Sequence, residues 1–347
     1  MTDAGALLLT RARLLRLGMA LCAGAAIPAS STLAQQQQPP GRPRMNTRPI
    51  PSTQEALPVV GCGTWLGFDQ RPGTPEYQRL PGVLDALFAA GGTVIDSSPM
   101  YGRSEETTGE LLAASNQHAT SVGASSVAGP PQDEKHPLGG QRGHEVPSVG
   151  AFLATKVWTS GREAGIAQME QSFTRLRTQR MDLMQVHNLV DWRTQLATLR
   201  GWKDQGRVRY IGITHYTASA YGEVESVLRA QKLDFLQINY SLDAREAEKR
   251  LLPLAAERGV AVIINLPFGG GGLLRRLRDK PLPDWASEIG CTSWAQVLIK
   301  FVLSHPAVTC TIPGTSRAEH MADNAAAGAG AIPDAAFWRR HAASLAV

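Results

Sequence analysis

The chain has 347 residues, of which 43% are hydrophobic and 19% are charged, as in an ordinary globular protein. Its formal net charge is +5, but six of the 35 basic and one of the 30 acidic residues lie in the first 48 positions, which leaves 29 of each sign elsewhere. This balance gives no support for a nucleic-acid-binding surface on the remainder, so we expect no nucleic-acid partner.

The first 34 residues are typical of an export signal. Three arginines, Arg11, Arg13 and Arg16, precede the apolar run LGMALCAGAAI, which is short for a membrane span and is followed by small residues up to Ala34. The window TRARLLR is similar to a twin-arginine signal whose second arginine is replaced by alanine. We therefore expect a periplasmic protein with no stable membrane span in its mature form, or a cytoplasmic one if the signal does not function.

Two further segments have low complexity. Residues 35–57 are rich in glutamine and proline and predict a disordered or extended linker. Residues 115–150 have the composition of a disordered loop and are interpreted as an insertion, with a partner-binding loop as the alternative. The spacing of the three histidines in this insertion matches no defined metal site, and we predict no metal.

The pattern of residues 58–347 alternates between short apolar runs and helical periodicity. The apolar runs predict eight strands, at 59–63, 93–96, 152–155, 182–186, 210–213, 235–238, 260–264 and 309–312. The helical patterns lie at 81–90, 162–178, 194–205, 218–230, 244–258 and 292–303. Eight strand–helix units of this length predict a single-domain α/β fold, the (β/α)8 TIM barrel. A doubly wound open sheet is the alternative, but no GxGxxG follows the first strand.

Four titratable residues follow the ends of consecutive predicted strands. Asp96 and Tyr101 follow the second strand, Lys156 ends the third, and His187 ends the fourth. A single lysine or histidine at a strand end is usually structural or solvated. Because the carboxyl ends of barrel strands face one shared site, four such groups together predict an active site.

A series of motifs from about Leu57 to Ala327 resembles the aldo-keto reductase family. The motifs, in order, are GCGTW (61–65), VIDSSPMYGRSEE (94–106), TKVW (155–158), QVHN (185–188), YIGIT (210–214), LQINYS (236–241) and IPGTSRAEHMADN (312–324). The resemblance implies an enzyme that reduces the carbonyl of a small aldehyde or ketone to an alcohol by hydride transfer from NADPH. We also expect a monomer.

The resemblance also implies a catalytic role for each of the four residues. Tyr101 would donate a proton to the carbonyl oxygen, and Lys156 would lower the pKa of that phenol. Asp96 would pair with Lys156 and hold it in place, while His187 would orient the substrate oxygen.

Cofactor contacts at the nicotinamide end are implied in the same way. Gly63 and Thr64 would approach the nicotinamide, and Thr214 and Gln237 would bind its carboxamide. The chain departs from the family at two cofactor positions, where His215 replaces an asparagine and Asn265 replaces a stacking aromatic residue. The glycine run 269–272 is either a loop that folds over the pyrophosphate or a simple turn.

At the other end of the cofactor, Thr315, Ser316 and Arg317 would meet the adenosine phosphate. Arg317 would suit a 2′-phosphate, since guanidinium binds phosphate through two hydrogen bonds. Asp323 and Asn324 would face the adenine.

Two tryptophans and two cysteines complete the interpretation. Trp65 and Trp158 match positions that line the substrate pocket in the family, although tryptophan is also a common core residue. Cys62 and Cys310 fall on the first and eighth strands, which are neighbours in a barrel. They are interpreted as buried free thiols, with a cross-strand disulfide as the alternative.

Two other function classes stay open. An exported, nicotinamide-binding redox sensor with little turnover would fit the export signal and the replaced cofactor residues. A hydrolase that uses Asp96 and His187 would need a nucleophile or a metal-ligand set that the sequence does not show.

Overall fold

The computed structural model describes residues 44–124 and 150–345, with side chains described up to Ser115 in the first range. The predicted export segment, residues 35–43 of the predicted linker, and residues 125–149 of the predicted insertion lie outside the described residues.

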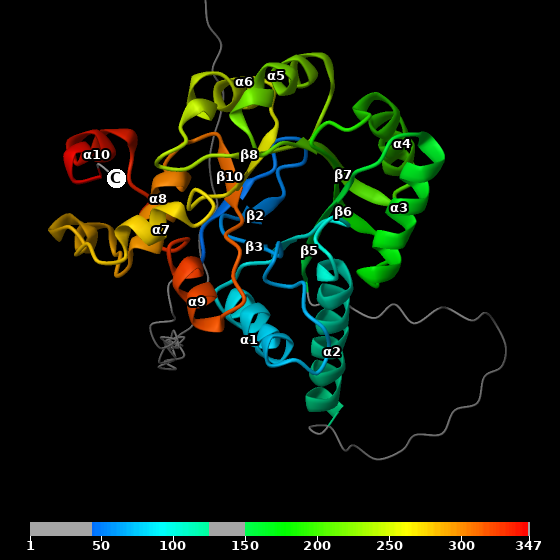
Figure 1. The fold of residues 1–347 in the computed structure, drawn as a ribbon, viewed down its shortest axis with the longest axis horizontal. Coiled ribbons are helices and arrows are strands. Elements are labelled where there is room, and N and C mark those ends of the chain that lie inside the picture. The colour runs from blue at the N-terminus through cyan, green and yellow to red at the C-terminus, as the bar shows by residue number, and fades with distance from the viewer. Residues whose placement is uncertain (1–43, 125–149, 346–347) are drawn as a thin grey trace, which may run out of the picture. The chain divides into compact units, whose positions relative to one another are not determined.

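Eight parallel strands form a closed ring (Figure 1). The strands are β3 (Cys62–Gly63), β4 (Val94–Asp96), β5 (Phe152–Val157), β6 (Met181–His187), β7 (Val208–Thr214), β8 (Phe235–Asn239), β9 (Ala261–Asn265) and β10 (Val308–Thr311). Each strand pairs with its neighbours in chain order, and the first and last meet where Gly61 N–H donates to the carbonyl of Thr311 at 2.9 Å. The predicted (β/α)8 barrel is confirmed, and the open-sheet alternative is wrong.

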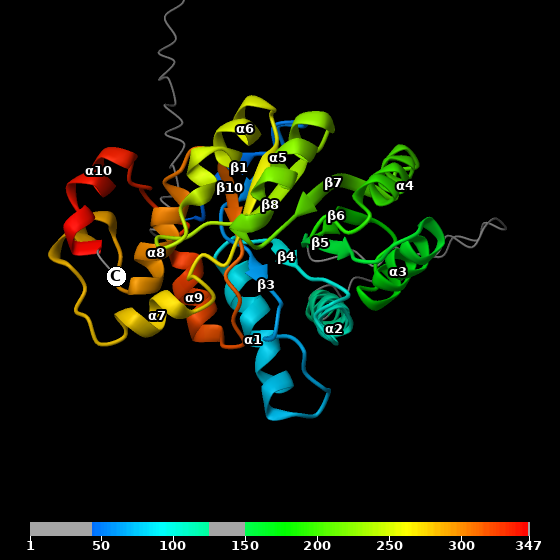
Figure 2. The ribbon, with the colours of Figure 1, turned by 45° about the horizontal axis from the view of Figure 1, so that its top comes forward.

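Helices surround this ring in both ribbon views (Figures 1 and 2). The α-helices are α1 (Pro75–Ala89), α2 (Ser104–Ala124), α3 (Arg162–Arg175), α4 (Trp192–Asp204), α5 (Tyr221–Ala230), α6 (Leu251–Glu257), α7 (Gly272–Leu277), α8 (Trp294–Leu303), α9 (Ala318–Ala326) and α10 (Ala335–Arg340). Helix α10 packs on α8, where the rings of Trp338 and Phe301 lie 5.4 Å apart. None of the helices in the described ranges is long and apolar enough to cross a membrane.

Alternating side chains of the strands build two apolar layers, as the period of two in a strand requires. Inside the ring, Phe152, Tyr210 and Phe235 pack against one another with ring centroids 5.5 to 6.0 Å apart. The other layer lies between the strands and the helices and forms the larger core. This aromatic layer fills the amino-terminal part of the barrel interior. The charged and amide side chains that point into the barrel therefore lie toward the carboxyl ends of the strands.

A β-hairpin closes the amino-terminal end of the barrel, in a segment for which the sequence predicted a disordered or extended linker. Strand β1 (Thr47–Pro49) pairs antiparallel with β2 (Ala56–Pro58). Ile50 and Leu57 are 0% and 2% exposed and join the inner core. The prediction of disorder is therefore wrong for this part of the linker. Pro49 and Pro58 end the two short strands of the hairpin, where a missing N–H is tolerated, and the apolar residues fill the barrel floor.

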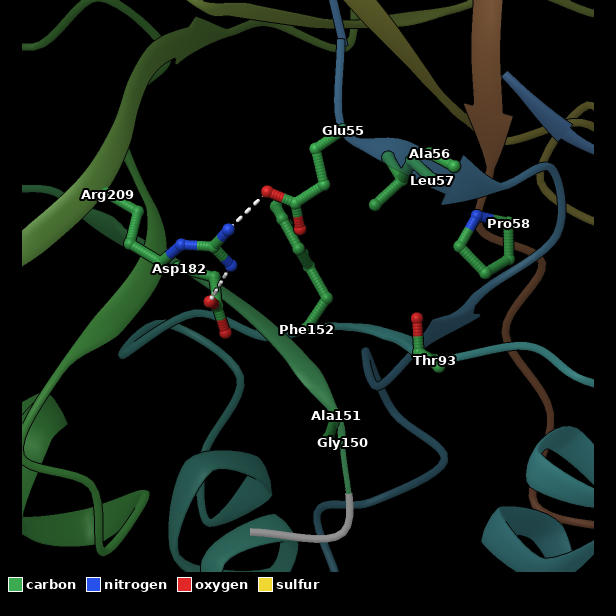
Figure 3. Close-up of a pocket in the computed structure, with 10 residues that line it drawn as sticks. All are labelled: Glu55, Ala56, Leu57, Pro58, Thr93, Gly150, Ala151, Phe152, Asp182 and Arg209. Carbon is green, nitrogen blue, oxygen red and sulfur yellow. Dashed lines mark hydrogen bonds and ion pairs between the residues drawn. The ribbon is translucent and has the colours of Figure 1, made fainter. Parts of the chain in front are cut away.

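An arginine links this hairpin to the barrel floor (Figure 3). The Arg209 guanidinium pairs with Glu55 of the hairpin segment and with Asp182 of β6, the latter at 2.6 Å. The Tyr210 hydroxyl also donates to Glu55 at 2.6 Å. A cavity of about 270 Å³ lies beside this cluster. Because both carboxylates already have partners, we interpret the cluster as a structural clamp.

Two helices extend further than the sequence indicates. Helix α1 begins at Pro75, six residues before the predicted start, because Thr74 caps it by accepting the N–H of Tyr77 at 3.2 Å and Pro75 suits the first turn. Helix α2 continues through residues 115–124, which the sequence assigned to the insertion loop.

The cysteines do not form the alternative disulfide. Cys62 lies in the layer between strands and helices, whereas Cys310 lies in the inner core, so the two side chains point to opposite faces of the sheet. Both thiols are free and fully buried, and burial raises their pKa above the ordinary value. The prediction of buried free thiols is confirmed for this pair.

Candidate active site

The four predicted catalytic residues meet at the carboxyl ends of β4, β5 and β6. Strand β4 ends at Asp96, β5 carries Lys156, and β6 ends at His187, each on the inner face of the ring. Tyr101 lies on the loop that connects β4 to α2. Parallel pairing in register brings these strand ends to one edge of the barrel, so the expected convergence is observed.

A buried ion pair lies at the centre of this cluster. The Lys156 ammonium donates to Asp96 Oδ2 at 2.6 Å and to the carbonyl of Ser97 at 2.7 Å, and the two charged side chains are 1% and 2% exposed. Burial alone would lower the pKa of Lys156, but Asp96 and Tyr101 outweigh it and raise that pKa. Lys156 is therefore a fixed cation at neutral pH.

The phenol of Tyr101 lies against this cation. A turn places it there, since Tyr101 N–H donates to the carbonyl of Ser98 at 3.0 Å with Pro99 at the second turn position. The Lys156 nitrogen lies 5.1 Å from the centre of the Tyr101 ring. Burial raises the pKa of Tyr101, while Lys156 acts to lower it. The lowering effect expected of Lys156 is thus present, but burial outweighs it and the pKa of Tyr101 is raised overall.

His187 completes the cluster as a neutral ring. Its imidazole stands edge-on to Tyr101, with centroids 6.1 Å apart and an angle of 86° between the planes. Burial, together with Lys156 and His215, lowers the pKa of His187 to about 3. His187 therefore carries no charge near neutral pH, and one of its nitrogens has a hydrogen to donate.

Two glutamines bind the other oxygen of Asp96. Gln237 Nε2 donates to Asp96 Oδ1 at 2.9 Å, and Gln185 Nε2 approaches the same oxygen at 3.5 Å. Thr214 in turn donates to Gln237 Oε1 at 3.1 Å. The predicted carboxamide-binding pair is thus connected to the catalytic carboxylate, through contacts that the sequence alone did not indicate.

Gly63 and Thr64 lie at the end of β3, against the same cluster. The Thr64 hydroxyl contacts the carbonyl of Asp96 at 3.0 Å and the Ser97 hydroxyl at 2.9 Å. A Cβ on Gly63 would approach the carbonyl oxygen of Ile312 to 2.8 Å, so a glycine is required for β3 to meet the segment after β10.

The two departures from the family pattern lie side by side at the ends of β7 and β9. His215 Nδ1 accepts the N–H of Tyr216 at 3.1 Å, and Asn265 Nδ2 contacts the carbonyl of His215 at 3.5 Å. The Oδ1 atoms of Asn265 and of Asn188, the residue after His187, are buried without a partner in the described part of the chain. Two such acceptors suit a ligand that supplies N–H donors, as the carboxamide of a nicotinamide does.

The glycine run forms successive turns. Gly269, Gly271 and Gly272 donate their N–H groups to the carbonyls of Leu266, Phe268 and Gly269, respectively. With three of the four amides used within the loop, the structure favours the simple-turn interpretation over a pyrophosphate cradle.

The residues predicted at the adenosine end lie after β10 and on α9. The backbone of Thr315 and Ser316 approaches Gly67 of the loop after β3. The exposed Arg317 pairs with Glu319, with Nε at 2.5 Å.

The two residues predicted to face the adenine are partly engaged elsewhere. Asp323 accepts from Ser293 and Gln296 of the α8 segment, both at 2.6 Å, and Asn324 is 3% exposed. The Asp323 carboxylate therefore joins α9 to α8, a role that the sequence did not indicate.

Large apolar side chains surround the carboxyl end of the barrel. The five that are exposed in the described ranges all follow strand ends: Trp65 (53%), Leu66 (65%), Met100 (43%), Trp158 (38%) and Tyr216 (53%). The sequence indicated the two tryptophans and missed the other three. In the same ranges, no three histidine, cysteine, aspartate or glutamate side chains are grouped to hold a metal ion.

Comparison with known proteins agrees with this arrangement. The model of the aldo/keto reductase family matches residues 59–339. The chain is 26% identical over 279 residues to methylglyoxal reductase YeaE of Escherichia coli, which covers 78% of this chain and 85% of that protein. It is 30% identical over 168 residues to the uncharacterized oxidoreductase YcsN of Bacillus subtilis, covering 45% and 55% of the two chains.

Solved structures share the fold. An aldo/keto reductase from Klebsiella pneumoniae, in complex with NADP and acetate, matches with a TM-score of 0.63 at 23% identity over 84% of this chain and 91% of that one. The glycerol dehydrogenase of Gluconobacter oxydans matches with a TM-score of 0.63 at 20% identity, over 86% and 94%. Because the family model covers nearly all of the barrel, the chain belongs to the aldo/keto reductase family of oxidoreductases.

Proposed function

We propose that this protein reduces aldehyde or ketone carbonyls to alcohols, with NADPH as the reductant. One observation carries the proposal: a buried Lys156–Asp96 pair lies against the ring of Tyr101, and the ring of His187 stands edge-on to that phenol. When bound, NADPH supplies the hydride. The NADP in the related Klebsiella structure and the two unpartnered asparagine oxygens support this cofactor.

Tyr101 acts as the general acid. Reduction builds negative charge on the carbonyl oxygen, and a proton from the phenol neutralises it. The raised pKa of Tyr101 keeps that proton in place at neutral pH. The Lys156 ammonium stabilises the phenolate that remains, and Asp96 holds the ammonium in position. General acid catalysis of this kind contributes about 10²–10⁴ in rate.

His187 orients the carbonyl oxygen. A neutral imidazole can donate one hydrogen bond without competing as an acid with Tyr101. Its ring is 9% exposed and is held edge-on to the phenol, so its direction is fixed before a substrate arrives. The exposed Trp65 and Trp158 suit carbonyl compounds with apolar or aromatic bodies.

Binding and turnover assays test the proposal together. Fluorescence titration of the purified protein with NADPH should show binding, and a panel of aldehydes and quinones should show oxidation of NADPH. Binding with turnover supports the reductase. Failure of both would contradict the cofactor assignment.

Arg317 is proposed to select NADPH over NADH through the 2′-phosphate. It must then exchange Glu319 for the phosphate, because the two side chains are paired in this structure. Arg317→Ala should raise the KM for NADPH about tenfold or more while changing that for NADH little, since only NADPH carries the extra phosphate. Equal KM values for both cofactors in the unmodified protein would remove the argument.

A redox-sensing barrel that binds nicotinamide with little turnover is the second candidate. The observation that favours it is Asn265, which stands where the family has a stacking aromatic residue. A lost stacking face costs about 1 kcal/mol, so affinity or redox preference would differ from the family's. NADPH binding without turnover of any carbonyl would favour this candidate.

We also propose export to the periplasm and a monomeric state. The arginine-rich, apolar N-terminal sequence carries the first proposal. Cell fractionation and the intact mass of the recovered protein test it, because a cleaved periplasmic form supports export and a full-length cytoplasmic form contradicts it. Light scattering on the purified protein tests the monomer.

A further inference from the structure

Ser98 makes two contacts that together constrain His187. Its side chain is fully buried, in the turn between β4 and Tyr101. The Ser98 Oγ accepts the N–H of Met100 at 3.3 Å and lies 3.2 Å from Nδ1 of His187. The family resemblance assigned a catalytic role to His187 but none to Ser98 or Met100.

The hydrogen in the contact with His187 can be placed by accounting for donors and acceptors. A backbone N–H only donates, so Met100 uses a lone pair of Oγ and leaves the hydroxyl hydrogen free. If His187 carried its hydrogen on Nδ1, Oγ would accept twice, and the buried hydroxyl hydrogen would have no acceptor among the described residues. Burying an unsatisfied donor is unfavourable. The hydroxyl therefore donates to Nδ1, and Nδ1 carries no hydrogen.

We infer that Ser98 is a positioning residue that fixes His187 as the Nε2–H tautomer. The hydrogen bond made by one imidazole nitrogen determines which of the two nitrogens carries the hydrogen. Ser98 supplies that bond at Nδ1 of His187. The Nε2–H is then directed away from Ser98, and it becomes the hydrogen that the ring can offer to a ligand. The same hydroxyl braces the turn whose last residue is Tyr101.

The role of Ser98 adds a residue to the proposed function, and the tautomer of His187 can also be tested independently of that function. Burial keeps His187 neutral, in agreement with its lowered pKa, so a tautomer is defined across the physiological pH range. The inference about the tautomer concerns the free protein and can be measured without substrate or cofactor. Its consequence for catalysis rests on the proposed reduction.

Nitrogen NMR of the full chain with ¹⁵N-labelled imidazoles measures the tautomer. The chain has eight histidines, and the spectrum of His187→Gln identifies the signals of His187. We expect Nε2–H at pH 7, with an Nδ1 resonance displaced by an accepted hydrogen bond. In Ser98→Ala that resonance should return toward the position of an unbonded nitrogen, and Ser98→Thr should restore it. An Nδ1–H or imidazolium form in the unmodified protein, or an identical Nδ1 resonance in Ser98→Ala, would overturn the inference.

Kinetics separate positioning from a merely structural effect. Ser98→Ala should lower kcat by about tenfold or more, with an unchanged Kd for NADPH, because a misaligned donor weakens only the transition state. Ser98→Thr should recover most of kcat. Ser304→Ala is the matched control, since within the described ranges that hydroxyl donates only to the carbonyl of Phe301 in α8. A changed tautomer with unchanged kcat would overturn the positioning role. If the unmodified protein reduces no carbonyl, the proposed function fails while the NMR result still decides the tautomer.

Discussion

Replacing Asp96 with asparagine should destabilise the protein strongly, because it leaves the Lys156 ammonium buried without a counter-charge. The two side chains are 1% and 2% exposed and 2.6 Å apart. Removing one partner of a fully buried pair costs about 3–5 kcal/mol. We expect a loss of this size in the free energy of unfolding at pH 7.

The loss should also depend on pH, in a direction that the structure determines. In the unmodified protein the pKa of Lys156 is raised above its ordinary value of 10.5, so its contribution to stability is constant from pH 7 to 9. Without Asp96, burial dominates and lowers the pKa of Lys156. The unfolded variant then binds a proton that the folded variant does not, and the stability of the variant rises with pH.

Denaturant unfolding at pH 7 and pH 9 measures both effects. The stability difference between Asp96→Asn and the unmodified protein should be smaller at pH 9. Glu246→Gln is the control, because its partner Lys249 is 69% exposed and the pair should contribute less than about 1 kcal/mol. A loss below about 1 kcal/mol for Asp96→Asn, or a difference that does not change with pH, would refute this reasoning.

Three further predictions follow from the packing and the charges. Gly109→Ala should lower the free energy of unfolding by about 1–3 kcal/mol, because the new Cβ would lie 2.1 Å from the carbonyl oxygen of Arg175. Gly201→Ala on helix α4 should raise it by about 0.5–1 kcal/mol, because its Cβ would meet nothing within 4 Å and alanine favours a helix over glycine. Burial raises the pKa of Glu105, so the folded protein loses stability as the pH rises above the ordinary pKa of a carboxyl group. Glu105→Gln should therefore be at least as stable as the unmodified protein in denaturant unfolding at pH 8. A clearly less stable variant at that pH would contradict this prediction. The kcat for reduction should stay level from pH 5 to 8, because His187 has a pKa of about 3, and a rate that falls below pH 7 would contradict a neutral ring.

The strands and the catalytic cluster could be predicted from the sequence for one shared reason. Buried parallel strands are continuous apolar runs, and the residues that end them meet at one edge in any closed barrel. Asp96, Lys156 and His187 needed only that rule, since each ends such a run. Tyr101 needed the additional turn that begins at Ser98, which the Ser-Pro pair indicates.

Contacts across the barrel could not be predicted from the sequence in the same way. The sequence gives no signal that Gln185 and Gln237 share an oxygen of Asp96, because that contact depends on the register of strands far apart in the chain. Ser98 and Asn188 lay within motifs that the sequence did indicate, but their roles depend on where a hydroxyl and an amide point. The hairpin that contains Leu57 was missed because its proline content resembles that of a linker.

The most direct test of the central claim is a comparison of Tyr101→Phe with the unmodified protein in single-turnover reduction of an aldehyde that the protein accepts. Phenylalanine keeps the ring against Lys156 and removes only the hydroxyl. We expect the Kd for NADPH to change less than about twofold, while the rate of the chemical step falls by about 10²–10⁴. A rate within a few-fold of the unmodified protein would contradict the assignment of Tyr101 as the proton donor.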